Sequence, residues 1–137
     1  MKVKDYLSQL KLINIKLNNK IVEKEELFTM GTKITPSYSG MPGGGNGVND
    51  KTANVAVLLV QIDTEINAMI SEMIILKRAI ISDIEKLSDS RYYQVLYKRY
   101  VEYKDFSVIA YEMHYTYQTT LNLHNKALKT LQRIIKK

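Results

Sequence analysis

The chain has 137 residues, of which 45% are hydrophobic and 25% charged, and it contains no cysteine. These values are typical of a folded protein in a reducing compartment, and they exclude disulfide bonds and thiolate metal sites. The net charge is +6, and residues 91–137 carry the whole excess, with nine Lys or Arg against three Asp or Glu. A basic segment on an otherwise balanced chain indicates a polyanionic partner.

Residues 1–30 are expected to form one amphipathic helix, because apolar side chains recur every three or four positions. The segment lacks the continuous apolar core of a signal peptide. The longest apolar run of the chain, Val55–Val60, is too short to span a membrane. We therefore expect a soluble cytoplasmic protein without a membrane partner. The apolar stripe of the first helix consists of Leu7, Leu10, Ile13, Leu17, Ile21, Leu27 and Phe28.

Residues 31–49 hold both prolines and all six glycines of the chain, which predicts a flexible connector. Gly43–Thr52 faintly resembles a phosphate-binding loop. That motif needs a glycine directly before the lysine and a preceding β-strand. Here Asp50 precedes Lys51 and the preceding segment is expected to be helical. We therefore expect no nucleotide site in this loop.

Residues 50–88 are expected to form a long helix that Asn49 or Asp50 can cap. Its apolar side chains alternate four and three positions apart, as in the seam of a coiled coil, until Asp83 interrupts them. Two apolar stripes together are wider than the first helix can cover, so we expect a helical hairpin that also forms a homodimer through residues 50–88. Alternatively, Met69, Met73 and Ile80 of this helix could form a groove that binds a ligand or a foreign helix. The seam is Leu59, Ile62, Ile66, Met69, Met73, Leu76, Ile80 and Leu87, and the second stripe is Ile70, Ile74, Ile81 and Ile84.

Residues 89–137 are expected to form a three-helix, helix-turn-helix domain, which makes the whole chain all-α. Its helices are predicted over 91–101, 106–113 and 117–135. Ser88, Asp89 and Ser90 are cap-type residues before the first helix, and Asp105 and Thr116 can cap the other two. Ala110 allows two crossing helices to approach closely. Four positions later, at His114, the chain must turn, and such turns often use a left-handed conformation in which glycine is usual and His is one of the enriched alternatives. The last helix should be anchored by Thr120, Leu123 or His124, Ala127 and Leu131.

The opposite side of the last helix carries the candidate DNA-binding residues. Amides of Asn and Gln can bridge adenine edges in the major groove, while Lys and Tyr can reach phosphates. A catalytic nucleophile with a base, an acid pair and a metal cluster are all missing from the sequence, so we expect neither an enzyme nor a cofactor. The candidates are Tyr117, Gln118, Thr119, Asn122, Asn125, Lys126 and Lys129.

Three segments of this domain carry a family resemblance, namely Tyr92–Tyr100, Phe106–Met113 and Leu123–Leu128. They resemble region 4 of bacterial sigma factors. More narrowly, the chain is similar to the small phage-encoded late-gene activators of Gram-positive bacteria of the ArpU and RinA type. This resemblance implies a regulator of phage or prophage genes that binds double-stranded DNA in the cytoplasm of a bacterial host and that could also contact RNA polymerase. His114 in place of the turn glycine and Thr120 in place of an aliphatic residue depart from the pattern. A looser similarity lies around Thr32–Thr35.

Two other functions remain open. A small terminase subunit of a phage packaging machine also joins a helix-turn-helix to an oligomerising coiled coil, although that family places the DNA-binding element first and forms rings. A protein-only adaptor would contact RNA polymerase and would bind no DNA. Light scattering separates the regulator from the packaging component. A dimer supports the regulator, and eight or more subunits support the packaging component.

Overall fold

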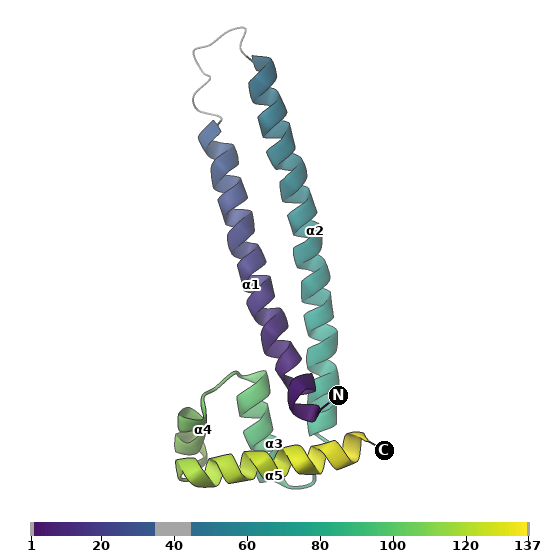
Figure 1. Cartoon of the computed structure of the whole chain (residues 1–137), viewed down its shortest axis with the longest axis vertical. Helices are drawn as coiled ribbons and strands as arrows, with labels where there is room; N and C mark the ends of the chain where they lie inside the picture. The colour runs from purple at the N-terminus through teal and green to yellow at the C-terminus, as the bar shows by residue number, and fades with distance from the viewer. Residues whose placement is uncertain (1, 35–44, 137) are drawn as a thin grey trace. The chain divides into compact units, whose positions relative to one another are not determined.

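The computed structural model describes residues 2–34 and 45–136, and the side chains of residues 2–31 and 53–136. The described residues form helices without any strand, which confirms the predicted all-α class. Figure 1 shows the elements in chain order. They are α1 (Val3–Ile34), α2 (Gly45–Ile84), α3 (Ser90–Leu96), the π-helix η2 (Tyr97–Val101), α4 (Phe106–Met113) and α5 (Tyr117–Ile135).

The predicted connector over 31–49 is shorter in the structure. α1 continues to Ile34 and α2 begins at Gly45, so helices occupy both edges of that segment. The rest of the connector, residues 35–44, lies outside the described residues. The side chains of residues 43–52, where we expected no nucleotide site, lie outside them as well.

The helices form two compact units. The first, here called the C-terminal unit, consists of Met1–Asn14 and Glu72–Lys137, and the second, the two-helix unit, consists of Ile15–Ser71. Both long helices therefore contribute to each unit. The boundary predicted at residue 89 differs from this division, because the first turns of α1 and the end of α2 belong with α3, η2, α4 and α5.

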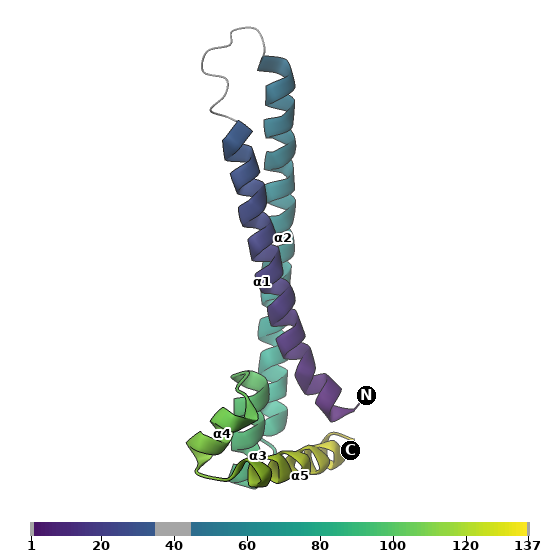
Figure 2. The same cartoon turned by 60° about the vertical axis from the view of Figure 1, so that its left-hand side comes forward.

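In the two-helix unit, α1 and α2 lie side by side and run antiparallel in both views (Figures 1 and 2). Two ion pairs link them. Lys20 Nζ lies 2.6 Å from Glu65 Oε2, and Lys24 Nζ lies 2.6 Å from Asp63 Oδ1. Near the end of α1, a Cβ added to Gly31 would come within 3.0 Å of Val55 Cγ1. The missing side chain thus permits a close approach of the two helices.

The predicted apolar stripes of these helices are only partly buried. Leu17, Ile62 and Ile66 lie in the interior, whereas Ile21 and Phe28 of the α1 stripe are 38% and 60% exposed. The eight residues of the α2 seam are all buried or half-buried, so the seam packs within the chain.

Part of the apolar surface of α2 is not covered by the described chain. Val57, Leu58 and Val60 remain 55%, 44% and 66% exposed. By length and composition, Ala53–Ile84 could also cross a membrane. However, Asp63 and Glu65 lie within this stretch, and both form ion pairs with lysines of α1. The charges of these two residues are thus paired within the two-helix unit.

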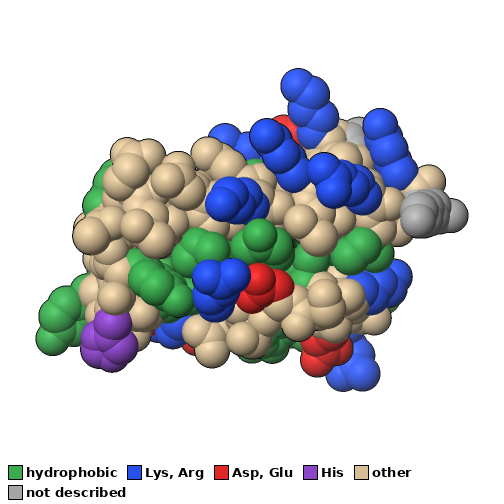
Figure 3. Space-filling view, turned by 90° about the horizontal axis from the view of Figure 1, so that it is seen from below, with side chains coloured by type: hydrophobic (Ala, Val, Ile, Leu, Met, Phe, Trp, Pro, Cys, Tyr) green, Lys and Arg blue, Asp and Glu red, His purple; other side chains and the backbone are tan. Residues whose placement is uncertain are grey.

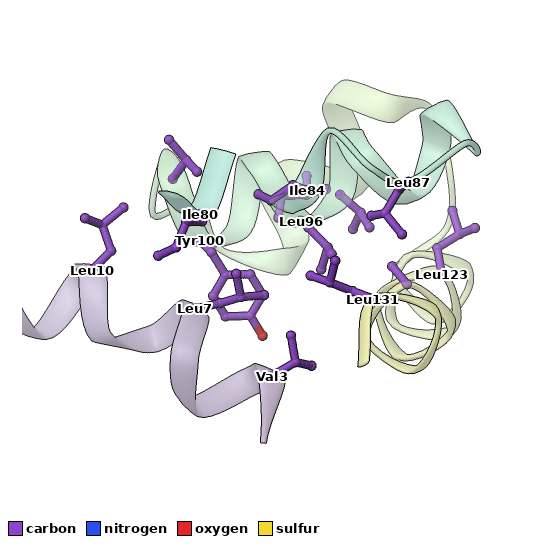
Figure 4. Packing of buried hydrophobic residues seen from close by; sticks show 14 residues of the cluster. Val3, Leu7, Leu10, Ile80, Ile84, Leu87, Leu96, Tyr100, Leu123 and Leu131 are labelled. Carbon is purple, nitrogen blue, oxygen red and sulfur yellow. The ribbon is translucent and has the colours of Figure 1, made fainter. Parts of the chain in front are cut away.

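The core of the C-terminal unit joins residues from both ends of the sequence (Figure 4). Side chains of α1 and α2 point toward those of α3, η2 and α5 (Figure 4). Most residues of this cluster are fully buried. Burial of each large aliphatic side chain contributes about 1.5–3 kcal/mol to folding. The cluster includes Val3, Leu7, Leu10, Ile80, Ile84, Leu87, Val95, Leu96, Tyr100, Val101, Ile109, Leu123, Ala127 and Leu131.

Two hydrogen bonds fix the first turn of α1 in this unit. The backbone N–H of Val3 donates to Gln132 Oε1 of α5 at 2.8 Å, and the Tyr6 hydroxyl donates to Asp83 Oδ2 of α2 at 2.7 Å. Burial and the nearby Asp83 carboxylate raise the pKa of the Tyr6 phenol. The Asp83 that interrupts the apolar seam is therefore the acceptor for a tyrosine of α1.

The three helices predicted over 91–135 differ in how closely they match. α4 and α5 have the predicted bounds, whereas the predicted helix 91–101 is divided into α3 and the π-helix η2. Asp89 caps α3, since its carboxylate accepts the backbone N–H of Arg91 at 2.9 Å. Asp105 occupies the N-cap of α4 as predicted, but its side chain makes no capping hydrogen bond.

Candidate nucleic-acid interface

The connection between α4 and α5 is only three residues long, from His114 to Thr116. His114 adopts φ 62° and ψ 38°, the left-handed conformation that was predicted for it. Its N–H donates to Tyr111 O at 3.3 Å, and the N–H of Tyr115 donates to Ala110 O at 3.0 Å. These two bonds form a Schellman motif, which satisfies the last carbonyls of α4 and sets the direction in which the chain leaves it.

Thr116 begins α5 as its N-cap, because its hydroxyl accepts the N–H of Thr119 at 3.1 Å. Thr120, which stands in place of an aliphatic residue, is fully buried. Its hydroxyl donates to Thr116 O at 2.9 Å, so no polar group is left unpaired by its burial. Leu123 and His124, which were predicted as alternative anchors of α5, are both buried. The whole buried stripe of α5 consists of Thr120, Leu123, His124, Ala127 and Leu131.

All seven candidate residues of α5 are exposed. At 3.6 residues per turn, Gln118, Asn122, Asn125 and Lys129 lie opposite the buried stripe. Thr119 and Lys126 lie on one flank of this line and Tyr117 on the other. The fold thus leaves the whole polar side of α5 accessible, while the binding role of these residues remains a prediction.

Some of these side chains are already engaged with each other. Gln118 Nε2 donates to Asn122 Oδ1 at 3.3 Å, which aligns the two amides along the helix. The hydroxyl of Thr119 accepts a hydrogen bond from Thr116 Oγ1 at 2.8 Å, in addition to the backbone cap. Thr119 is therefore committed to the start of the helix, whereas the two amides keep free donors and acceptors.

The charge on α5 has one sign. No acidic residue follows Glu112 in the sequence. Four basic side chains, Lys126, Lys129, Arg133 and Lys136, are exposed, and none of them forms an ion pair with a described residue. Figure 3, seen from below, shows most of the Lys and Arg side chains of this view gathered toward one side, with few Asp or Glu side chains among them.

The basic residues of α3, η2 and the loop that follows are engaged differently. Lys98 and Lys104 both bind Glu112, at 2.9 Å and 2.8 Å, and they lower the pKa of its carboxyl group. Arg91 pairs with Asp89 at 2.9 Å. Within residues 89–136, the basic side chains that form no ion pair with a described residue are therefore those of α5 and of Lys136, which follows it.

Arg133 and Lys136 were missing from the predicted site. They continue the line of Asn125 and Lys129 at spacings of four and three residues, as the helix period requires. This spacing was visible in the sequence, but the prediction was limited to the first turns of the helix.

His124 links the core to the exposed face. Its Nε2 lies 2.7 Å from the Tyr100 hydroxyl, and its Nδ1 lies 3.3 Å from Asn125 Oδ1. With the amide oxygen on Nδ1, that nitrogen carries the proton, and the tyrosine donates to Nε2. The ring also meets the edge of Phe106, which Arg99 covers at 4.3 Å from its centroid. Asn125 is thereby oriented from beneath by a buried side chain.

Burial lowers the pKa of His124 to about 4, and the positive charges of Lys4 and Arg99 act in the same direction against the opposing hydrogen bond to Asn125. An unfolded histidine has a pKa of about 6.5 and binds its proton at higher pH than the folded protein does. The contribution of neutral, buried His124 to the free energy of unfolding is therefore complete above about pH 6.5 and is lost as the pH falls toward 4.

We expect the free energy of unfolding to decrease by about 2 kcal/mol between about pH 7 and pH 5. Denaturant unfolding at a series of pH values measures this slope. His124→Gln should flatten it, because glutamine cannot titrate, while His114→Asn, a change at the exposed histidine, should preserve it. An equal slope in wild type and His124→Gln would contradict the assignment.

The comparisons with known proteins give a family but no function. No curated protein and no solved structure matches the chain. The model of DUF1492, described as a protein of unknown function, matches residues 36–132. This match covers more than half of the chain and includes all seven candidate residues of α5. The chain therefore belongs to the DUF1492 family of proteins of unknown function.

Proposed function

We propose that the protein is a DNA-binding transcription regulator of phage or prophage genes, with α4 and α5 as a helix-turn-helix similar to sigma region 4. The observation that carries the proposal is the polar side of α5, which is exposed, free of acidic residues and directly opposite the buried stripe. A basic helix surface of this kind is suited to a duplex, whose phosphates carry one negative charge per about 1.7 Å of axis.

The order of residues along α5 fits the docking of a recognition helix. In helix-turn-helix proteins the first residues of that helix contact base edges in the major groove. Here the first turns offer the amides of Gln118, Asn122 and Asn125, which suit adenine N6 and N7. Lys129 and Arg133 follow toward the other end, where they would contact phosphates and position the helix without reading the sequence.

We also propose that the protein acts as a dimer through α2. The exposed Val57, Leu58 and Val60 supply apolar surface that a second copy would bury. Two recognition helices about 34 Å apart would then reach successive major grooves of a two-fold operator. Light scattering at micromolar concentration tests this part of the proposal, and a monomer would overturn it.

The DNA-sequence preference of the protein tests whether Gln118 and Asn122 contact bases. The double variant Gln118→Ala, Asn122→Ala should lose its preference for particular sequences but still bind DNA nonspecifically, since each bidentate contact contributes about 1–3 kcal/mol of discrimination. The measurement is a selection of bound genomic fragments at moderate salt, followed by competition between selected and unrelated duplexes.

The matched control is Asn67→Ala, Gln94→Ala, which removes the same two residue types at other exposed positions. This control should select the same fragments as wild type. An unchanged preference in the Gln118, Asn122 variant would refute the assignment of these two residues.

A second candidate function, a protein-only adaptor that contacts RNA polymerase, is favoured by the outer surface of α4. There Val108 is 42% exposed and Tyr111 is 83% exposed, which is more apolar surface than DNA contact requires. Such an adaptor would retard no duplex of any sequence at low salt, whereas the proposed regulator would.

A further inference from the structure

The first turn of α1 is held against the basic half of α5. Val3 is 6% exposed, and its backbone N–H donates to Gln132 Oε1, which comes from a residue 129 positions later in the chain. Gln132 itself lies next to Arg133 and one turn beyond Lys129. A buried side chain and a backbone hydrogen bond together fix this turn of α1 beside the α5 surface.

Lys2 and Lys4 flank the buried Val3, and both are exposed. Neither forms an ion pair with a described residue, and Asp5, the acidic residue of the same turn, makes no ion pair with either of them. The positive charge of Lys4 also lowers the pKa of His124, which lies in α5 beneath Asn125. Lys4 is therefore close enough to α5 for its charge to act on His124, a residue of the buried stripe.

Positive charges from two distant parts of the chain are thus gathered in one unit without neutralisation. The N-terminus of α1 adds the positive end of its helix dipole to the same region. Like charges held close together repel each other, and that cost is offset when a polyanion covers them. The set is Lys2, Lys4, Lys126, Lys129, Arg133 and Lys136.

We propose that Lys2 and Lys4 extend the DNA interface to the first turn of α1, where they contact backbone phosphates of the duplex that α5 enters. This inference rests on the proposed function and adds to it a contact made by residues 1–30, a segment that the sequence assigned to the helical hairpin. Contacts of this kind contribute affinity and salt dependence, but they do not read bases.

The test measures fluorescence anisotropy of a labelled, mixed-sequence duplex of about 25 base pairs between 50 and 200 mM KCl. The double variant Lys2→Gln, Lys4→Gln should reduce the slope of log K against log salt by about 1.8 for each bound protomer, and affinity at 0.1 M salt by about 60-fold. Lys2→Arg, Lys4→Arg should restore the wild-type slope, because arginine also neutralises phosphate.

The matched control is Lys77→Gln, Arg78→Gln, which removes two exposed charges from α2 in the same unit. It should retain the wild-type slope, and thermal melting of both double variants should show that the fold is kept. A slope in the Lys2, Lys4 variant equal to that of wild type would overturn this inference and leave the proposed function intact. Failure of the wild-type protein to bind the duplex would overturn both.

Discussion

Replacing Lys126, Lys129 and Arg133 together by glutamine is expected to weaken nonspecific DNA binding by about 500-fold per protomer at 0.1 M salt. Each phosphate that a basic side chain neutralises contributes about 0.9 to the slope of log K against log salt, so three contacts contribute about 2.7. All three side chains are exposed and have no ion-pair partner among the described residues, so their charge is available to a duplex. Titration of a labelled duplex at several salt concentrations gives both the affinity and the slope.

The control for this triple variant removes the same charge elsewhere. Lys16, Lys77 and Arg78 are exposed basic residues of α1 and α2, and their replacement by glutamine should change the slope far less. Equal losses in the two triple variants would show that binding depends on net charge alone, and the role given to α5 would then be wrong.

Leu7→Ala is expected to destabilise the protein by about 2–5 kcal/mol, the range found when a buried leucine is truncated and a cavity remains. Leu7 is fully buried in the core of the C-terminal unit, among side chains of α2, α3 and α5. A loss of this size is a large part of the stability of an ordinary domain, which is about 5–15 kcal/mol. Denaturant unfolding followed by circular dichroism measures it.

Leu12→Ala is the matched control, because Leu12 lies on the same helix but is 50% exposed. Its truncation should cost about 0.5 kcal/mol or less, as surface substitutions usually do. If both variants lose the same small amount, α1 does not contribute to the core as described, and the position of Lys2 and Lys4 beside α5 is lost with it.

The sequence predicted the local features of α4 and α5 correctly. Thr116 caps α5, and His114 takes the left-handed conformation between the two helices. Signals of this kind are local, since a cap or a turn residue acts on backbone groups within a few positions. The buried stripe of α5 was also predictable, because its spacing follows the helix period.

The sequence could not show which core the apolar residues of α1 and α2 join. Leu7 and Leu10 belong to the same periodic stripe as Leu17, yet they pack in a different compact unit. Periodicity identifies the face that is buried but not its partner, and the contact between Val3 and Gln132 joins residues 129 positions apart. The π-helix η2 was equally hidden, because π-helical turns are rare and occur mostly as single turns within segments that otherwise read as α-helix.

The most direct test of the central claim is a nuclear magnetic resonance titration of the labelled protein with a short duplex. The account predicts that the largest shifts occur at exposed residues of α5, such as Gln118, Asn122 and Lys129, and that smaller shifts occur at the first turn of α1. Val57 to Val60 of α2 should not respond. Shifts confined to α2 or to the outer surface of α4, with α5 unaffected, would contradict the claim.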